Sequence, residues 1–191
     1  SYRAACARSV LEGVAARADA MGFDVFGALE YEFFLFQETP ASARAKGYRD
    51  LVPFTPGMFG YSMLRSGVHA ELYHELLDVM DQLRCPIEGL HTETGPGVLE
   101  AALRVTEVCE AADRAALFKT FTKILAERRG LMATFMAKWS AAVPGQSGHV
   151  HVSLFNKSDG SSAFFQDGAP STMSRVMRSF VAGQVKYLPE V

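Results

Sequence analysis

Residues 28–36 read Ala28-Leu29-Glu30-Tyr31-Glu32-Phe33-Phe34-Leu35-Phe36. This apolar run, rich in aromatic side chains, predicts a buried β-strand. Because side chains alternate across a strand, Glu30 and Glu32 share one face. Leaving two carboxylates ionised and unpaired in such surroundings would cost roughly several kcal/mol. We therefore expect them to meet a cation, or one of them to hold a proton.

A second stretch, residues 91–100, supplies two further carboxylates: His91-Thr92-Glu93-Thr94-Gly95-Pro96-Gly97-Val98-Leu99-Glu100. Glu93 and Glu100 are an odd number of residues apart, so they cannot share a face of one straight strand. The Gly-Pro-Gly segment between them predicts a turn that reverses the chain. We expect two antiparallel segments in which Glu93 and Glu100 face each other and act on one ion.

A third stretch places two imidazoles in a strand-like run. His149 and His151 alternate with Val150 and Val152, so both rings are expected on one side. Taken singly, a His-x-His pair, a Gly-Pro-Gly turn and a Glu-x-Glu pair are commonly structural. The Glu-x-Glu pair would ordinarily mark a solvated strand edge, but its aromatic neighbours argue against that interpretation.

In order, spacing and flanking residues, the three stretches resemble the catalytic domain of the glutamine synthetase family. The family pattern is Glu-x-Glu before Phe-Phe-Leu-Phe, then His-x-Glu opening a Gly-Pro-Gly turn that closes on Glu, then Phe-Met-x-Lys and a Gly-rich loop into His-x-His-x-Ser-Leu. Here the last part runs from Phe135-Met136-Ala137-Lys138 to Gly145-Gln146-Ser147-Gly148-His149-Val150-His151-Val152-Ser153-Leu154. The resemblance covers residues from about 25 to 156.

The resemblance implies a site for two divalent metal ions. By position, Glu32, Glu93 and Glu100 would hold one Mg²⁺ or Mn²⁺. Glu30 and His149 would hold the second, beside a glutamate that this sequence does not contain. Hard divalent cations prefer oxygen ligands, which fits four carboxylates with one imidazole and makes zinc the less favoured metal.

The resemblance also implies a nucleotide site. Glu88, His91, His151 and Ser153 match positions where the family contacts ATP, and Gly145 matches part of the loop that holds the amino-acid substrate. The implied reaction is a ligation in nitrogen metabolism. ATP phosphorylates the γ-carboxylate of glutamate, and ammonia or an amine attacks the acyl phosphate. Family members assemble as homo-oligomeric rings with active sites between subunits, which is the assembly expected here.

Two departures from the family pattern concern the acceptor. Pro144 stands at the start of a loop where glutamine synthetases usually have Asn-Gly-Ser-Gly, and Trp139 follows Lys138 where Pro is usual. Because both changes lie beside the substrate loop, an amine or a polyamine is an alternative to ammonia as the acceptor.

Two further classes of protein remain as alternatives. A non-catalytic structural relative of the family is disfavoured because the recognisable metal-ligand positions all carry side chains able to bind metal. A metal-dependent hydrolase would ordinarily place His-x-His on an early barrel strand within a repeating β-α pattern, and the sequence has no such repeat.

Composition bounds the protein class. The chain has 191 residues, 49% hydrophobic residues and a formal net charge of −2, which predicts a globular chain with a core. The sequence lacks the excess of basic residues that is typical of nucleic-acid binding. It also has no apolar run long enough to predict a membrane span and no pattern that predicts a signal peptide. Cys6, Cys85 and Cys109 lack metal-site spacing and are expected to be free thiols in a reducing cytoplasm.

The order of elements predicts an α+β fold: a curved antiparallel sheet with flanking helices, like the glutamine synthetase catalytic domain. Helices are expected over residues 3–21, 68–83, 111–129 and 171–187, with strands near 131–138 and 148–155. Residues 37–67 predict a long loop region with one short strand. By the resemblance, residues 1–191 are part of the catalytic domain, without the family's N-terminal β-rich domain or the C-terminal part of the catalytic domain. We expect these residues alone to be inactive.

Overall fold

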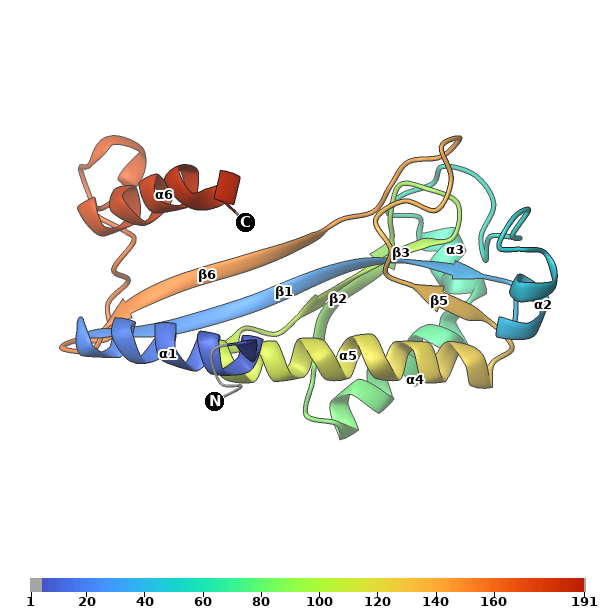
Figure 1. Cartoon of the computed structure of the whole chain (residues 1–191), viewed down its shortest axis with the longest axis horizontal. Coiled ribbons are helices and arrows are strands. Elements are labelled where there is room, and N and C mark those ends of the chain that lie inside the picture. The colour runs from blue at the N-terminus through green and yellow to red at the C-terminus, as the bar shows by residue number, and fades with distance from the viewer. Residues whose placement is uncertain (1–4, 191) are drawn as a thin grey trace. The chain divides into compact units, whose positions relative to one another are not determined.

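The computed structural model describes residues 5–190. The chain forms two compact units. Figure 1 labels most of the helices and strands named below. The first unit comprises the residues up to 27, residues 106–111 and the residues from 151 onward, and the second comprises residues 28–105 and 112–150. The expected α+β class is confirmed, with helices flanking an open antiparallel sheet.

The sheet is built around its longest strand, β1. Its strands are β1 (Phe23–Phe36), β2 (Ile87–Thr92), β3 (Val98–Leu103), β4 (Thr106–Glu107), β5 (Met132–Thr134) and β6 (Gly148–Asn156). The strand order is β2-β3-β1-β4, and β5 and β6 also pair with β1. The pairings of β1 with β3, β4 and β5, and of β2 with β3, are antiparallel.

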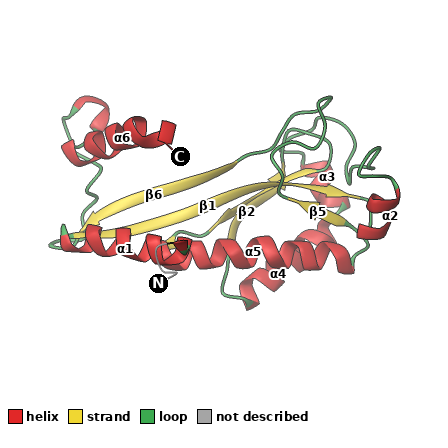
Figure 2. Ribbon diagram, in the orientation of Figure 1, coloured by secondary structure: helices red, strands yellow, loops and turns green. Residues whose placement is uncertain are grey.

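In the second unit, one face of the sheet packs against helices (Figure 2). Its helices are α2 (Pro40–Ala45), α3 (Met63–Val68), α4 (Ala70–Gln82) and most of α5 (Val108–Arg128). Phe33 and Leu35 of β1 are buried with Leu76 of α4 and Phe118 of α5. The rings of Phe33 and Phe118 meet edge-on, with centroids 5.9 Å apart. Alternation along β1 therefore leaves the opposite face for Glu30 and Glu32.

That opposite face is closed at one end by a smaller apolar cluster. Phe34 and Phe36 are fully buried there with Val98, and the ring of Trp139 packs edge-on against Phe36 at 5.0 Å. Because Phe34 and Phe36 follow Glu32 at intervals of two, one face of β1 changes from acidic to apolar along its length.

The first unit contains α1 (Ala7–Ala20), the start of β1, most of β6, the 3₁₀ turn η2 (Pro170–Thr172), α6 (Arg175–Tyr187) and the 3₁₀ turn η3 (Leu188–Glu190). Phe26 and Phe155 meet edge-on at 5.4 Å. Lys157 pairs with Asp19 and, at 3.4 Å, with Asp24. Among the described residues, no helix combines the length and apolar character needed to cross a membrane.

Several expected boundaries were wrong. The first strand begins at Phe23 rather than Ala28, the strand expected over residues 131–138 spans only Met132–Thr134, and the last helix begins at Arg175. Within residues 37–67 the structure has α2 and the start of α3, while the only strand-like contact is an isolated bridge from Phe36 to Pro53. Residues 3 and 4 of the first expected helix lie outside the described part.

Capping residues explain where the helices α2, α3 and α6 begin. Thr39 and Ser42 form a reciprocal capping box that starts α2 directly before Pro40. The Ser62 side chain accepts a hydrogen bond from the Arg65 N–H at the start of α3, and Ser174 does the same for Met177 in α6. The many Pro and Gly residues in segment 37–67 favoured the prediction of a loop over the caps of α2 and α3.

Candidate metal and nucleotide site

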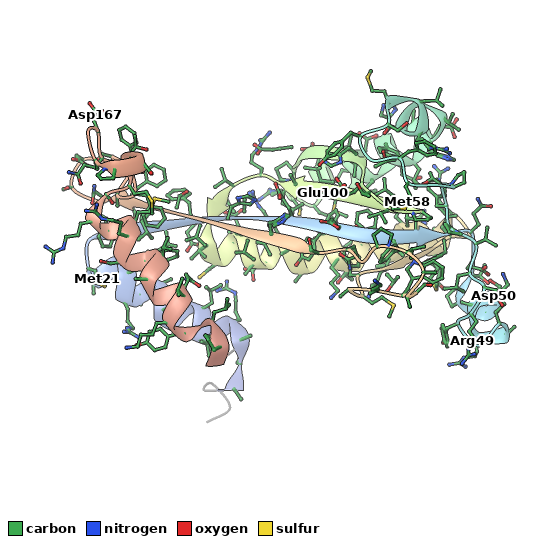
Figure 3. The ribbon with its side chains drawn as sticks, turned by 90° about the horizontal axis from the view of Figure 1, so that it is seen from above. Met21, Arg49, Asp50, Met58, Glu100 and Asp167 are labelled. Carbon is green, nitrogen blue, oxygen red and sulfur yellow. The ribbon has the colours of Figure 1, made fainter. Side chains whose placement is uncertain are left out.

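A row of polar side chains crosses three neighbouring strands of the second unit. Glu32 on β1 is the direct partner of Glu100 on β3, and Glu100 is in turn the partner of His91 on β2. Glu30, two residues before Glu32, belongs to the same face of β1. Figure 3 views the sheet from the face on which Glu100 is labelled. Like charges placed directly opposite each other destabilise a sheet, so this row calls for a cation.

Two groups of possible metal ligands converge on Glu100. In the first, one ligand atom from each of Glu30, Glu100 and His149 lies within 4.8 Å of the other two. In the second, His91, Glu93 and Glu100 meet the same criterion. Nδ1 of His149 lies 3.0 Å from Oε2 of Glu30. Four of the five expected metal ligands, Glu30, Glu93, Glu100 and His149, thus fall into two groups that share Glu100. The groups differ from the expected ligand sets, because His91 joins Glu93 and Glu32 belongs to neither.

The electrostatics of Glu100 reflect this crowding. Burial raises the pKa of the Glu100 carboxyl, and the negative charges of Glu30, Glu32 and Glu93 raise it further against the opposing effect of His91. A bound divalent cation would reverse this trend because it favours the ionised carboxylate.

Glu93 offers an oxygen suited to a metal. Its Oε1 accepts a hydrogen bond of 2.6 Å from the Thr94 N–H, whereas its Oε2 is buried and lies 4.0 Å from Nδ1 of His91. Burial alone would raise the pKa of Glu93, but the hydrogen bonds from Thr94 and from the Tyr61 side chain, together with the charge of His91, outweigh it, and the pKa falls below its ordinary value. An ionised carboxylate in this buried position fits a hard cation.

The expected turn between Glu93 and Glu100 is confirmed. Gly95 and Gly97 have φ values of 141° and 71°, conformations that favour glycine. A Cβ atom on Gly97 would collide with the carbonyl oxygen of Leu35, and the Gly97 carbonyl itself accepts a hydrogen bond of 2.8 Å from the Leu35 N–H. The turn thus holds the β2–β3 hairpin against β1.

Glu32 has a different environment from the other carboxylates. Its Oε2 accepts a hydrogen bond of 3.0 Å from the Ser147 N–H, and its Oε1 accepts one of 2.9 Å from the Ser147 hydroxyl. Neither group of converging ligands found in the described part of the chain includes Glu32. Glu32 lies next to these groups because it is the cross-strand partner of Glu100.

The loop before β6 is tightly constrained. A Cβ on Gly145 would lie 2.7 Å from the Ala137 carbonyl oxygen, and one on Gly148 would lie 2.9 Å from the Glu30 carbonyl oxygen. Glycine at position 148 therefore allows His149 to approach Glu30. This supplies a physical reason for two glycines of the motif.

The residues expected to contact ATP are distributed over both units. His91 lies in the polar row, with its Nδ1 4.0 Å from Oε2 of Glu93. Glu88 on β2 is half-exposed and pairs with Arg104 at 3.3 Å. His151 and Ser153 are exposed positions of β6 in the first unit. Their placement beside His91 and Glu88 stays a prediction.

The sequence analysis did not identify Tyr61 as a site residue. Its ring centroid lies 4.7 Å from that of His91, and its N–H donates a hydrogen bond of 2.6 Å to the Thr92 carbonyl. Tyr61 has φ of 54°, a strained conformation for a bulky residue that commonly marks functional sites. The available signal was the long loop around Gly57 and Gly60, whose path cannot be read from local sequence.

Two further histidines of the second unit, His69 and His74, lie outside the two groups of possible ligands. The ring of His69 packs against Phe54 with centroids 4.1 Å apart, and burial lowers the pKa of His69. His74 is exposed on α4. Of the cysteines, Cys85 is buried and Cys6 is exposed, and all three are free thiols, as expected.

Comparisons with known proteins agree with the fold. Residues 4–191 match the family described as "Glutamine synthetase, catalytic domain". The type-1 glutamine synthetase 2 of Dictyostelium discoideum is 42% identical over 185 residues, which are 97% of this chain and 35% of that protein. The glutamate–isopropylamine ligase of a Pseudomonas sp is 33% identical over 184 residues, 96% of this chain and 40% of that protein.

A solved structure described as apo GmaS without ligand has a TM-score of 0.81 and 27% identity, covering 95% of this chain and 41% of that one. The match over residues 4–191 defines the chain as belonging to a catalytic domain of the glutamine synthetase type. The chain belongs to the glutamine synthetase family. It spans 35% to 41% of the length of these relatives.

Proposed function

We propose that the intact protein is an ATP-dependent ligase that forms an amide between the γ-carboxylate of glutamate and ammonia or an amine, through an acyl phosphate. Family membership supports a glutamate ligase. The observation that carries the proposal is the row of Glu32, Glu100 and His91, flanked by the remaining possible ligands. Phosphoryl transfer needs such a concentration of cation ligands because its catalysis rests on positioning and charge stabilisation.

The residues present fit two divalent cations, Mg²⁺ or Mn²⁺. Glu32, Glu93 and Glu100 would hold one ion, and Glu30 and His149 would hold the other. The ionised, buried carboxylate of Glu93 and the concentration of carboxylates around Glu100 support a site for hard cations. Glu32 enters this assignment as the cross-strand partner of Glu100. When bound, the cations would neutralise phosphate oxygens and help align the attacking carboxylate.

The chain's own side chains would bind and orient the substrates. His91 would donate a hydrogen bond or positive charge to a phosphate oxygen, and Glu88, His151 and Ser153 would contact the rest of the nucleotide. Gly145 would let the backbone of the substrate loop approach the bound substrate, glutamate. The ring of Tyr61 against His91 would restrict the orientation of that imidazole.

The acceptor is either ammonia or an amine. One relative is described as a glutamine synthetase and another as a glutamate–isopropylamine ligase. Pro144 and Trp139 depart from the family pattern beside the substrate loop, and Trp139 is packed into the apolar cluster at the end of β1. These features keep amines and polyamines among the substrates to be tested.

The active assembly would be a homo-oligomeric ring with sites shared between subunits. This chain corresponds to part of the catalytic domain, and we propose that residues 1–191 alone do not turn over. The family's N-terminal β-rich domain and the C-terminal part of its catalytic domain would complete the site in the intact protein.

The test is product analysis with the intact protein. It would be incubated with ATP, Mg²⁺, glutamate and a panel of ammonia, alkylamines and polyamines, with phosphate release and mass spectrometry as readouts. We expect phosphate release that requires glutamate and acceptor, together with a γ-glutamyl amide. ATP-independent amide formation, or phosphate release without any amide, would contradict the proposed reaction.

A further inference from the structure

Ser147 holds both oxygens of the Glu32 carboxylate. Its N–H and hydroxyl donate hydrogen bonds of 3.0 and 2.9 Å to Oε2 and Oε1. The backbone adds a third contact, because the Glu32 N–H donates to the Ser147 carbonyl at 3.2 Å. Three bonds thus join residues separated by 115 positions in sequence.

The hydrogen bonds from Ser147 leave the Glu32 carboxylate able to bind a cation. An ionised carboxylate offers about four lone-pair sites, of which the two bonds from Ser147 use only two. Two donors from one residue fix the plane of the carboxylate, which would otherwise rotate about its terminal torsion. The face shared with Glu100 therefore receives an oriented carboxylate.

Ser147 is itself held by a closed loop. The Gln146 N–H donates to the Ala137 carbonyl at 2.8 Å, and its side-chain amide donates to the Met136 carbonyl at 2.7 Å. Gln146 is only 9% exposed, and Trp139 anchors the same loop among Phe34 and Phe36. The loop that contains Gly145 is thereby tied at one end to the apolar cluster and at the other to Glu32.

We propose that Ser147 is a positioning residue that orients Glu32 for the first cation and thereby joins the loop containing Gly145 to the metal centre. This inference rests on the proposed metal site. Groups that hydrogen-bond a metal-ligating carboxylate change metal affinity when they are removed, because the ligand loses its fixed orientation.

The test measures Mn²⁺ affinity of the chelator-treated intact protein by isothermal titration calorimetry, without substrates or turnover. Ser147→Ala is expected to weaken binding of the first ion about tenfold, at the lower end of the usual range because the N–H bond remains. Ser147→Thr, which keeps the hydroxyl, is expected to retain the affinity. Ser140→Ala is the matched control, since the Ser140 hydroxyl accepts a hydrogen bond from Ala142 in the same loop and bonds no carboxylate.

A double-mutant cycle with Glu32→Gln tests whether Ser147 acts through Glu32. We expect Ser147→Ala to add little once Glu32 is neutral, because the two changes remove one interaction. Unchanged Mn²⁺ affinity in Ser147→Ala, an equal loss in Ser140→Ala, or full additivity with Glu32→Gln would overturn the inference while leaving the metal site standing. Absence of Mn²⁺ binding by the wild-type protein would instead overturn the metal site and this inference together.

Discussion

Glu32 and Glu100 are direct cross-strand partners on β1 and β3, so two carboxylates face each other on one side of an antiparallel sheet. The opposite side of the same strands is packed with Phe33, Leu99 and the helices. The apolar face holds the sheet against the helices. We propose that the acidic face binds the cations.

Glu38 should stabilise the loop after β1 in a pH-dependent way. Its carboxylate is 3% exposed and binds Lys46 at 2.5 Å, Ser42 at 2.6 Å and the Val52 N–H at 3.1 Å. The hydrogen bond from Lys46, followed by those from Ser42 and Val52, lowers the pKa of Glu38 from 4.5 to about 2.

A depressed carboxyl pKa contributes stability above the unfolded value of 4.5, and this stability is lost as the pH falls toward about 2. Glu38→Gln should therefore lower the melting temperature at pH 7 and lose this deficit between pH 4.5 and 2. Thermal melts of Glu38→Gln and wild type across that pH range measure this difference in melting temperature. Glu12→Gln is the control, because Glu12 forms an exposed ion pair with Arg8. A pH-independent difference would exclude ionisation of Glu38 as the cause.

Gly97→Ala should destabilise the protein more than Gly47→Ala. Both glycines have positive φ, 71° and 61°, so both substitutions carry a similar backbone strain of order 1 kcal/mol. Only at Gly97 would the new Cβ meet a carbonyl oxygen, that of Leu35, whereas nothing lies within 4 Å at Gly47. Denaturant unfolding of the two variants gives the comparison, and equal losses would show that the hairpin does not pack as described.

The sequence predicted the parts of the site that depend on local periodicity. The period of two placed Glu30 and Glu32 on one face, and the Gly-Pro-Gly turn placed Glu93 and Glu100 on an antiparallel hairpin. The pairing of Glu32 with Glu100 could not be predicted in this way, because the register between β1 and β3 is set by packing of segments distant in sequence. The contact of Ser147 with Glu32 depends on the same long-range arrangement.

Loop residues were the least predictable from sequence. The loop that carries Tyr61 is held beside His91 by Thr92, whose carbonyl and hydroxyl accept hydrogen bonds from the N–H groups of Tyr61 and Ser62. No local pattern around Tyr61 encodes those partners. Likewise, the capping side chains Thr39 and Ser62 start helices in a segment whose composition favours loops.

Thr92→Val should release the loop that contains Tyr61. Thr92 is 2% exposed, and its hydroxyl accepts a hydrogen bond of 2.9 Å from the Ser62 N–H. Valine has the same shape but leaves that N–H without its partner, at a cost of about 1–3 kcal/mol. Amide hydrogen exchange should accelerate at Tyr61 and Ser62.

The matched control for this prediction is Thr120→Val, because the exposed Thr120 hydroxyl donates only to a carbonyl of its own helix. We expect no change in exchange near Tyr61 in that variant. If Thr92→Val left exchange at Ser62 unchanged as well, the loop would be held by contacts other than Thr92.

We propose that the acidic face of the sheet binds the cations on which ligation depends, and Glu100 is common to both groups of possible ligands. The most direct measurement is ATP-dependent ligation by intact Glu100→Gln protein, titrated with Mg²⁺ and Mn²⁺ and compared with wild type. We predict that turnover falls by about two orders of magnitude or more while the melting temperature without metal is kept, with partial recovery at high Mn²⁺. Near-normal ligation by Glu100→Gln at low metal concentration would contradict the claim.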